Sequence, residues 1–196
     1  IMSQVRQEVY KQEEEKLLSN KVFATLIFIF TEVMFFTALI SAFLIIRGDE
    51  KVSWEIPLGV KLPVLATAYN SLVLIGSGLL LFLAGLSFKK ERSEKIRSLL
   101  GWSTVLGAFF VCFQGYEWMQ LISYGLTMKS SIFGACFFLL IGTHGIHALL
   151  GVLVLAYLYM ISKNKLDHEN IKAVQIFWFF IVGLWPLLYG LVYFGH

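Results

Sequence analysis

Five long apolar runs, almost free of charged residues, set the strongest limit on what this chain can fold into. They cover about residues 22–46, 62–88, 98–124, 131–161 and 173–194. Each run reaches the roughly 20 residues that an α-helix needs to cross the hydrocarbon core of a bilayer. Helices buried in a soluble protein keep a polar face at 3.6-residue spacing, whereas these runs are apolar all round. The sequence therefore predicts an all-α membrane protein, a bundle of five transmembrane helices.

Composition and charge support this class and exclude others. Only 15% of the 196 residues are charged, against about 25% in soluble domains. The basic residues form no continuous stripe, so no nucleic-acid partner is predicted. Cys112 and Cys136 lie inside apolar runs and are interpreted as small apolar side chains, not as disulfide or metal residues. Residues 1–21 are highly charged and lack a signal-peptide core, which predicts a polar N-terminal segment ahead of a transmembrane domain over 22–196.

The distribution of Lys and Arg predicts the orientation of the helices. Twelve of these residues lie in the N-terminal segment, the 89–97 stretch and the 162–172 loop, which share one side, and four lie on the other side. Because cytoplasmic loops are enriched in Lys and Arg, the N-terminus is expected in the cytoplasm and the C-terminus outside. Aromatic residues near the run ends are expected to anchor the helices at the bilayer surface: Trp54, Trp102, Tyr124 and Tyr193.

Small residues in the fourth run indicate where helices touch. Gly142, Gly145, Ala148 and Gly151 follow one another at three-residue steps. Lipid gives helices no hydrophobic reason to associate, so close backbone approach at small residues supplies much of the packing. We therefore expect this side of the fourth helix to meet a neighbouring helix.

Several polar side chains fall inside the apolar runs and need a protein environment. A charged residue at the centre of a transmembrane helix costs about 2.5–3.5 kcal/mol on insertion scales. Such a group is expected to face the protein interior, to be paired or to be neutral. The sequence thus predicts a buried polar cluster that contains Glu32, Asn70, Gln114, Glu117, His144 and His147.

The two histidines of the fourth run allow two interpretations. His144 and His147 could be haem or metal ligands or a proton relay, or they could be neutral imidazoles bonded to Glu32, Glu117 or a backbone carbonyl. Ligands three residues apart cannot occupy opposite faces of one haem, and two histidines are few for a metal centre. We favour the second interpretation and predict no catalytic residue, cofactor-binding residue or metal ligand on this chain.

Four strings in register resemble the signatures of one family, subunit III of the haem–copper oxygen reductases. They are residues 31–36 (TEVMFF), 70–74 (NSLVL), 114–118 (QGYEW) and 143–151 (THGIHALLG). The family has a seven-helix form and a five-helix form that lacks the first two helices, and this chain is similar to the bacterial five-helix form. The resemblance covers all of the chain except the N-terminal segment and the last helix.

The resemblance implies a non-catalytic subunit of a respiratory terminal oxidase, in first place cytochrome c oxidase, in the bacterial inner membrane. The complex would be an enzyme of aerobic electron transport, while this chain would carry no redox centre. Haems and copper are expected on partner subunits, and bound phospholipid is expected on this one. The chain would pack on catalytic subunit I and on other subunits of the oxidase, and the complex could be part of a respiratory supercomplex. It would support proton uptake by the oxidase and the stability of the complex. Glu32 would be the interior-facing carboxylate near the histidines.

The last helix departs from the family pattern. The family often has Trp-His-Phe-Val-Asp where this chain has residues 178–182 (WFFIV), so Phe179 and Val182 replace the His and the Asp. Quinol oxidases and nitric oxide reductase accessory subunits therefore stay open as alternatives. A rival from another class is a small proton-coupled transporter with Glu32 and Glu117 as carriers, although the halves show no inverted repeat. A membrane haem protein based on the two histidines is the weakest alternative.

Overall fold

The computed structural model describes residues 20–54, 56, 60–88, 93–162 and 168–194, so the predicted N-terminal segment lies outside it except for its last two residues. The described residues form five helices, which are α2 (Asn20–Gly48), α3 (Val64–Phe88), α4 (Ser93–Ser123), α5 (Ile132–Ile161) and α6 (His168–Tyr193). All five are long and apolar enough to cross a membrane. Continuous helices satisfy every interior backbone group within one segment, as a bilayer requires. The predicted all-α bundle of five transmembrane helices is confirmed.

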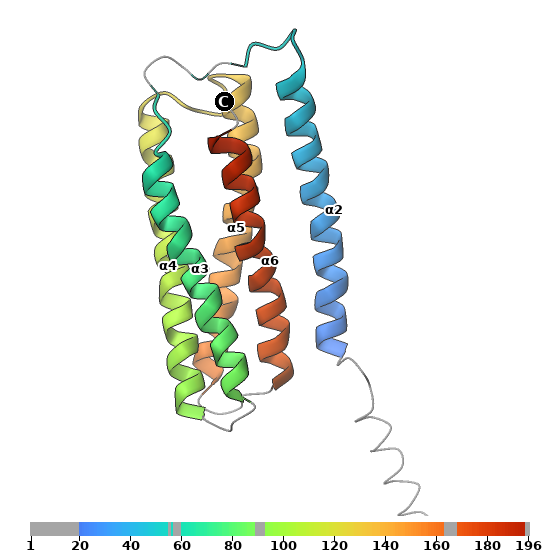
Figure 1. Ribbon diagram of the computed structural model, residues 1–196, viewed down its shortest axis with the longest axis vertical. Coiled ribbons are helices and arrows are strands. Elements are labelled where there is room, and N and C mark those ends of the chain that lie inside the picture. The colour runs from blue at the N-terminus through green and yellow to red at the C-terminus, as the bar shows by residue number, and fades with distance from the viewer. Residues whose placement is uncertain (1–19, 55, 57–59, 89–92, 163–167, 195–196) are drawn as a thin grey trace, which may run out of the picture.

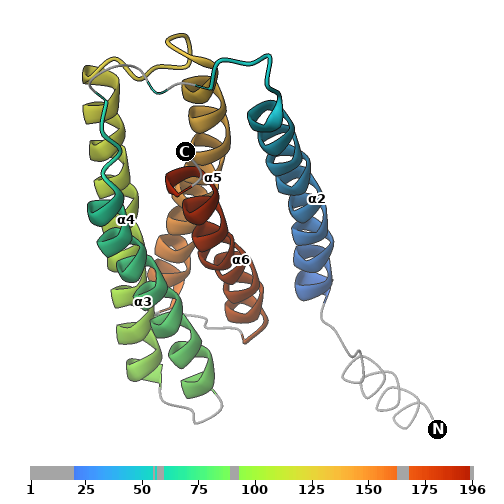
Figure 2. The same cartoon turned by 45° about the horizontal axis from the view of Figure 1, so that its top comes forward.

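Four of the helices form a closed ring, and the fifth lies outside it. Around the ring α3 packs on α4, α4 on α5, α5 on α6 and α6 on α3, while α2 lies against α6 and touches α5 only in places. Figures 1 and 2 show α2 standing beside this ring, on the side away from α3 and α4. We call the end where α2, α4 and α6 begin the basic end, because Lys- and Arg-rich stretches of the sequence precede the starts of these helices or include them.

The connection between α4 and α5 is short and held by its own backbone. After the last turn of α4, Gly125 takes a φ of 94°, a left-handed conformation that glycine adopts without steric cost. The Leu126 N–H then donates to the Leu121 carbonyl at 2.9 Å, which closes the helix as in a Schellman motif. Ser131 caps α5, its Oγ accepting from the Gly134 N–H at 3.0 Å. These caps keep α4 and α5 as antiparallel neighbours.

Helix α6 is the centre of the packing. Its fully buried large side chains include Trp178, Trp185 and Tyr193. The Trp178 indole N–H donates to Ser77 Oγ at 3.1 Å, and the Trp185 indole N–H donates to Ser71 Oγ at 2.7 Å. Both serines belong to α3, so each buried indole finds a polar partner across the helix interface.

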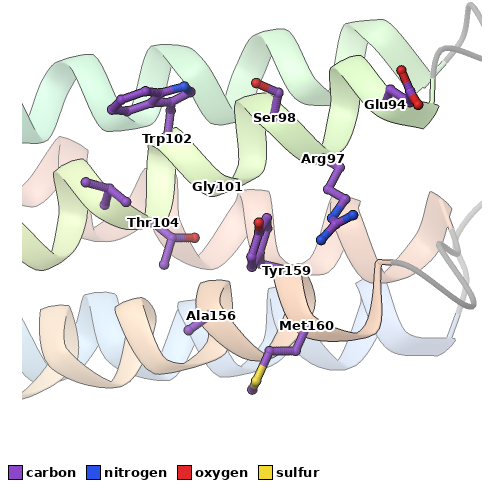
Figure 3. Close-up of a pocket in the computed structure, with 10 residues that line it drawn as sticks. Glu94, Arg97, Ser98, Gly101, Trp102, Thr104, Ala156, Tyr159 and Met160 are labelled. Atoms are coloured by element: carbon purple, nitrogen blue, oxygen red, sulfur yellow. The ribbon is translucent and has the colours of Figure 1, made fainter.

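The aromatic residues predicted as interfacial anchors behave in two ways. Trp102 and Tyr124 are 61% and 62% exposed. Tyr124 directly follows the last residue of α4, whereas Trp102 is the tenth residue of that helix, on which Figure 3 shows it. Tyr193 is only 1% exposed, so its prediction as an anchor is wrong. The first turns of α5 cover it, with the Phe137 ring centroid 6.0 Å from its own. Trp54 packs inward as well, in the loop between α2 and α3.

The small residues of α5 meet large rings of two neighbouring helices. A Cβ built on Gly145 would lie 2.5 Å from the Trp118 ring of α4, and one on Gly151 would lie 2.7 Å from the Trp178 ring of α6. Nothing lies within 4 Å of a Cβ built on Gly142. The expected close approach of a neighbouring helix is therefore confirmed at Gly145 and Gly151, and the expectation is wrong at Gly142.

Candidate functional site

The polar residues that the sequence singles out occupy several separate places in the bundle. Within the described residues, hydrogen bonds and ion pairs do not join them into one network. They form the Glu32–His147 pair, the Gln114–Glu117 pair, and two single groups, Asn70 and His144.

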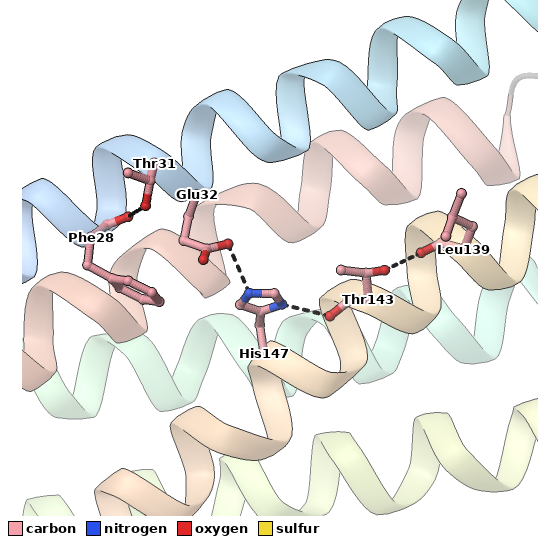
Figure 4. A network of polar contacts seen from close by, with 6 residues as sticks. All are labelled: Phe28, Thr31, Glu32, Leu139, Thr143 and His147. Carbon is pink, nitrogen blue, oxygen red and sulfur yellow. Dashed lines mark hydrogen bonds and ion pairs between the residues drawn. The ribbon is translucent and has the colours of Figure 1, made fainter.

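Glu32 and His147 form a polar contact between α2 and α5. Glu32 Oε2 lies 2.9 Å from His147 Nε2, and the two side chains are 16% and 15% exposed. The other ring nitrogen, Nδ1, lies 2.8 Å from the backbone oxygen of Thr143, one turn earlier on α5. Figure 4 shows the imidazole held between these two oxygens. The Phe36 ring packs edge-on against the imidazole, with 5.3 Å between the centroids.

The two ring nitrogens of His147 meet different partners. The Thr143 carbonyl only accepts, so His147 Nδ1 carries a hydrogen toward it. Nε2 faces the Glu32 carboxyl oxygen at 2.9 Å, a close contact that lacks hydrogen-bond geometry. Each polar group thus has the other beside it inside the bundle, where an isolated polar group would cost most.

The pair lies about midway along both helices. Glu32 follows the first residue of α2, Asn20, by twelve positions, roughly 18 Å along the axis at 1.5 Å per residue. His147 precedes the last residue of α5 by fourteen positions, roughly 21 Å. Because α2 otherwise packs mainly on α6, this contact is its principal polar tie to α5.

His144 lies one turn away from His147 in apolar surroundings. It is 1% exposed and stacks on Trp185, with centroids 5.2 Å apart and an interplanar angle of 24°. Neither ring nitrogen has a hydrogen-bond partner among the described residues. A cavity of about 180 Å³ between α4 and α5 borders the ring and is lined also by Gln114 and Trp118.

A second buried carboxyl lies between α3 and α4. Glu117 is 2% exposed. Its Oε2 accepts from the Thr67 hydroxyl at 2.8 Å and from the Gln114 amide at 3.2 Å. Glu117 Oε1 and the Tyr193 hydroxyl are buried without a hydrogen-bond partner in the described part of the chain. Sequence reasoning missed Thr67, although a threonine in a transmembrane run was a signal for an interhelical bond.

Other polar contacts tie α3 to α4. The Asn70 amide donates to the Phe110 carbonyl at 3.1 Å. Ser77 Oγ donates to the Ser103 carbonyl at 2.8 Å, and Ser103 Oγ donates to the Ser77 carbonyl at 2.9 Å. Reciprocal bonds of this kind bring two helix backbones close together. These residues hold the scaffold together, and Ser103 was not anticipated from the sequence.

Helix α6 carries two further polar contacts that the sequence did not single out. The Gln175 amide donates to the Leu81 carbonyl at 2.7 Å, and the Tyr189 hydroxyl donates to the Val64 carbonyl at 2.9 Å. At the positions where the last helix departs from the family pattern, Val182 packs 3.3 Å from a Cβ built on Gly78 and Phe179 is 37% exposed. At both positions where the chain departs from the family pattern, the side chain is therefore apolar and its surroundings suit an apolar group.

The chemistry open to this arrangement is the holding of a proton. In the described ranges, no three His, Cys, Asp or Glu side chains lie close enough together to hold a metal ion. The Glu32–His147 pair joins a carboxyl to an imidazole, two groups that exchange protons readily. It is the clearest candidate for chemistry among the buried polar groups.

Comparison with known proteins identifies the family. The family described as cytochrome c oxidase subunit III matches residues 7–196. Cytochrome c oxidase subunit 3 of Thermostichus vulcanus is 28% identical over 178 residues, 88% of this chain and 86% of the relative. The protein of the same name from Synechocystis sp. is 26% identical over 178 residues, 88% of this chain and 75% of the relative.

A third relative matches over a similar length. Cytochrome c oxidase subunit 3 of Corynebacterium diphtheriae is 28% identical over 185 residues, 87% of this chain and 85% of the relative. Three findings indicate the same family: the five helices long and apolar enough to span a membrane, the four signature strings in register, and the family match over nearly the whole sequence. The chain belongs to the cytochrome c oxidase subunit III family, the membrane-spanning third subunits of terminal oxidases.

Proposed function

We propose that this chain acts as a non-catalytic subunit of cytochrome c oxidase and packs beside the catalytic subunit I in a bacterial inner membrane. In this proposal the haems and copper belong to partner subunits, and the basic end faces the cytoplasm. Two observations support it. His147 is engaged by Glu32 and by the Thr143 carbonyl, and Lys and Arg gather in the sequence segments of the basic end.

The Glu32–His147 pair carries the functional part of the proposal, which is support of proton uptake by the oxidase. The pair brings a carboxyl and an imidazole, two groups that can each bind a proton, together about midway along α2 and α5. A proton taken up by either group changes the charge of the pair by one, and the neighbouring group lies close enough to share that change. The pair would therefore act as a proton-holding group beside the path that feeds the catalytic subunit.

We also propose that phospholipid is bound on this chain as part of its stabilising role. An apolar groove of about 410 Å³ runs between α2, α5 and α6 near the basic end. Its lining includes Phe28, Val154 and Phe177. The shape and apolar lining suit an acyl chain, which would fill the space where α2 makes few contacts with α5.

The proton-holding role is tested by Glu32→Gln in the assembled oxidase. The amide keeps the size of the side chain and can still hydrogen-bond to His147, but it cannot exchange a proton. Turnover at high pH, where protons are scarce, is expected to fall relative to turnover at low pH. Purified chain in liposomes is expected to show no proton flux, with either residue at position 32.

The matched control is Thr31→Val, because the Thr31 hydroxyl bonds only its own helix, at 2.7 Å from the Phe28 oxygen. This control is expected to keep the normal pH profile. A proton flux through the isolated chain that disappears with Glu32→Gln would favour the transporter alternative. Unchanged turnover of the Glu32→Gln variant at every pH would show that Glu32 does not support proton uptake.

A further inference from the structure

Glu117 is a buried carboxyl without a basic partner, near the end of the bundle opposite the basic end. Its side chain is 2% exposed. Among the described residues, no Lys, Arg or His forms an ion pair with it, and its two hydrogen-bond partners, Thr67 and Gln114, are neutral. An ionised carboxylate in apolar surroundings is costly unless its charge is balanced. A proton or a bound cation must therefore neutralise Glu117.

Four buried oxygen atoms of this region have no hydrogen-bond partner in the described part of the chain. They are Asn70 Oδ1, Gln114 Oε1, Glu117 Oε1 and the Tyr193 hydroxyl. All four side chains are at most 4% exposed. Amide and carboxylate oxygens only accept hydrogen bonds, so the Tyr193 hydroxyl is the one group of the four that can donate. The set thus has more acceptors than its own members can satisfy.

Three helices bring these residues together. On α3, Thr67 and Asn70 lie three residues apart and so on one face. The Thr67 hydroxyl lies 2.8 Å from Glu117 Oε2, and the Asn70 amide donates at 3.1 Å to a backbone carbonyl of α4 one turn before Gln114. The Gln114 amide nitrogen lies 3.2 Å from the same Glu117 oxygen. Tyr193, on α6, lies close enough to Glu117 for an electrostatic interaction.

Two helices end beside this set of oxygens. Tyr193 is the last residue of α6, and Glu117 lies less than two turns before Ser123, the last residue of α4. The C-terminal end of a helix carries partial negative charge on its unpaired carbonyl groups, which favours a cation. Helix α3 begins at this end of the bundle and opposes the effect, one helix against two.

We propose that Glu117 and the neighbouring oxygens bind a small monovalent cation such as sodium. One carboxylate and one monovalent cation leave the site neutral, whereas calcium would leave a net positive charge within the bilayer. A proton on the carboxyl would also balance the charge, but it could serve only one of the unpaired oxygens. The inference goes beyond the proposed function and does not depend on it.

Such a site differs from a transition-metal centre. Hard cations take carboxylate, amide and hydroxyl oxygens as ligands. The lack of a cluster of three His, Cys, Asp or Glu side chains among the described residues therefore does not bear on it.

The test follows unfolding of the purified full chain in mixed micelles at constant ionic strength, titrated with sodium chloride, calcium chloride or choline chloride. A ligand that binds only the folded chain shifts the unfolding equilibrium by one plus the ratio of its concentration to its Kd. Sodium at about ten times its Kd is expected to shift this equilibrium roughly elevenfold toward the folded chain, and choline and calcium less than about twofold. A shift with choline or with calcium equal to that with sodium would overturn the proposal.

The same titration at several pH values separates a bound cation from a bound proton. The titratable groups that interact with Glu117 in the described structure are Tyr189 and Tyr193. The sodium response is expected to weaken as the pH falls, because protons compete for the carboxylate. No sodium response at any pH, with stability that rises on acidification in the unmodified chain but not in Glu117→Gln, would show a proton instead and overturn the proposal.

Two variants and a matched control locate the site. Glu117→Gln keeps the size of the side chain, removes its charge and is expected to abolish the sodium response. Tyr193→Phe removes only a hydroxyl and is expected to weaken sodium binding roughly tenfold. Glu50→Gln removes an exposed carboxylate from the loop after α2, at the same end of the bundle, and is expected to leave the response unchanged. A response that survives both site variants, or is lost equally with Glu50→Gln, would overturn the site.

Discussion

Phe36 contacts both histidines of α5, whose environments otherwise differ. Its ring, 1% exposed, packs edge-on against both imidazoles, with centroid distances of 6.3 Å to His144 and 5.3 Å to His147. His147 meets a carboxyl, whereas His144 meets the indole of Trp185. Two histidines one turn apart thus have different environments and different chemistry.

At the residue scale, the first prediction concerns the cost of removing one member of the Glu32–His147 pair. Glu32→Leu leaves His147 Nε2 without its partner and is expected to destabilise the fold by about 1–3 kcal/mol. Glu32→Gln keeps a hydrogen bond and is expected to cost less. Unfolding of the full chain in mixed micelles, followed by circular dichroism, measures both. Equal stability of the leucine variant and the unmodified chain would show that the contact is not formed.

The sequence could predict which polar residues are buried but not how they pair. A carboxylate in an apolar run must meet protein, and His144 and His147 were both in reach of Glu32 by spacing. Spacing along one helix says nothing about how a neighbouring helix is rotated. That rotation depends on packing, which places Phe36 against both imidazoles and brings His147 alone to Glu32.

At the scale of elements, α6 joins the ring through a seam of hydrogen bonds with α3. Trp178 and Trp185 donate to Ser77 and Ser71, seven and six residues apart along their helices. Each indole would otherwise leave a buried N–H unsatisfied in an apolar environment. The seam therefore fixes the register of α6 against α3 as well as their distance.

The second prediction tests this seam with a double-mutant cycle. Ser77→Ala and Trp178→Phe each remove one partner, and their coupling is expected to be about 0.6 kcal/mol and at most about 1.7 kcal/mol, as for interhelical hydrogen bonds in other membrane proteins. Unfolding free energies of the two single variants and the double variant give this value. Strict additivity would mean that the indole and the hydroxyl do not interact.

The third prediction uses two glycines of α5 that the sequence could not distinguish. Gly151→Ala places a Cβ 2.7 Å from the Trp178 ring, and such overpacking is expected to cost about 1–3 kcal/mol. Gly142→Ala meets nothing within 4 Å and serves as the matched control, with little change expected. The same unfolding measurement compares them. Equal effects at both positions would contradict the packing of α5 on α6.

The number of helices could be predicted from the sequence, but the faces that they turn toward one another could not. Length and hydropathy predict five helices, because a bilayer demands them. The helices are apolar all round, so no polar face marks the side that turns inward. For this reason the close approach at Gly142 and the surface position of Tyr193 were predicted incorrectly, since both depend on which neighbour covers that side.

At the scale of the whole molecule, the ring of α3 to α6 is the scaffold and α2 is an attached helix. The window of α2 that could span the membrane is 11% buried, against 28–39% for the other four helices. A broad apolar face of α2 is thus left for lipid or for another subunit. The Glu32–His147 pair joins the attached helix to the scaffold.

The fourth prediction concerns the orientation of the whole bundle. The excess of Lys and Arg at the basic end predicts that this end is cytoplasmic. With Cys112 and Cys136 replaced by alanine, Lys129→Cys is expected to react with an impermeant maleimide in intact cells. Lys95→Cys is expected to react only after permeabilisation. The reverse pattern would invert the topology, and the chain without an added cysteine is the control.

The central claim is that this chain is a haem-free member of an oxidase complex. The most direct measurement is affinity purification of the tagged chain from native membranes in mild detergent, with identification of the co-purifying chains and haem spectra before and after they are separated. We predict a haem-bearing catalytic subunit in one-to-one ratio and no haem on the separated chain. Haem that stays bound stoichiometrically to this chain alone, or a chain that purifies without any oxidase subunit, would contradict the account.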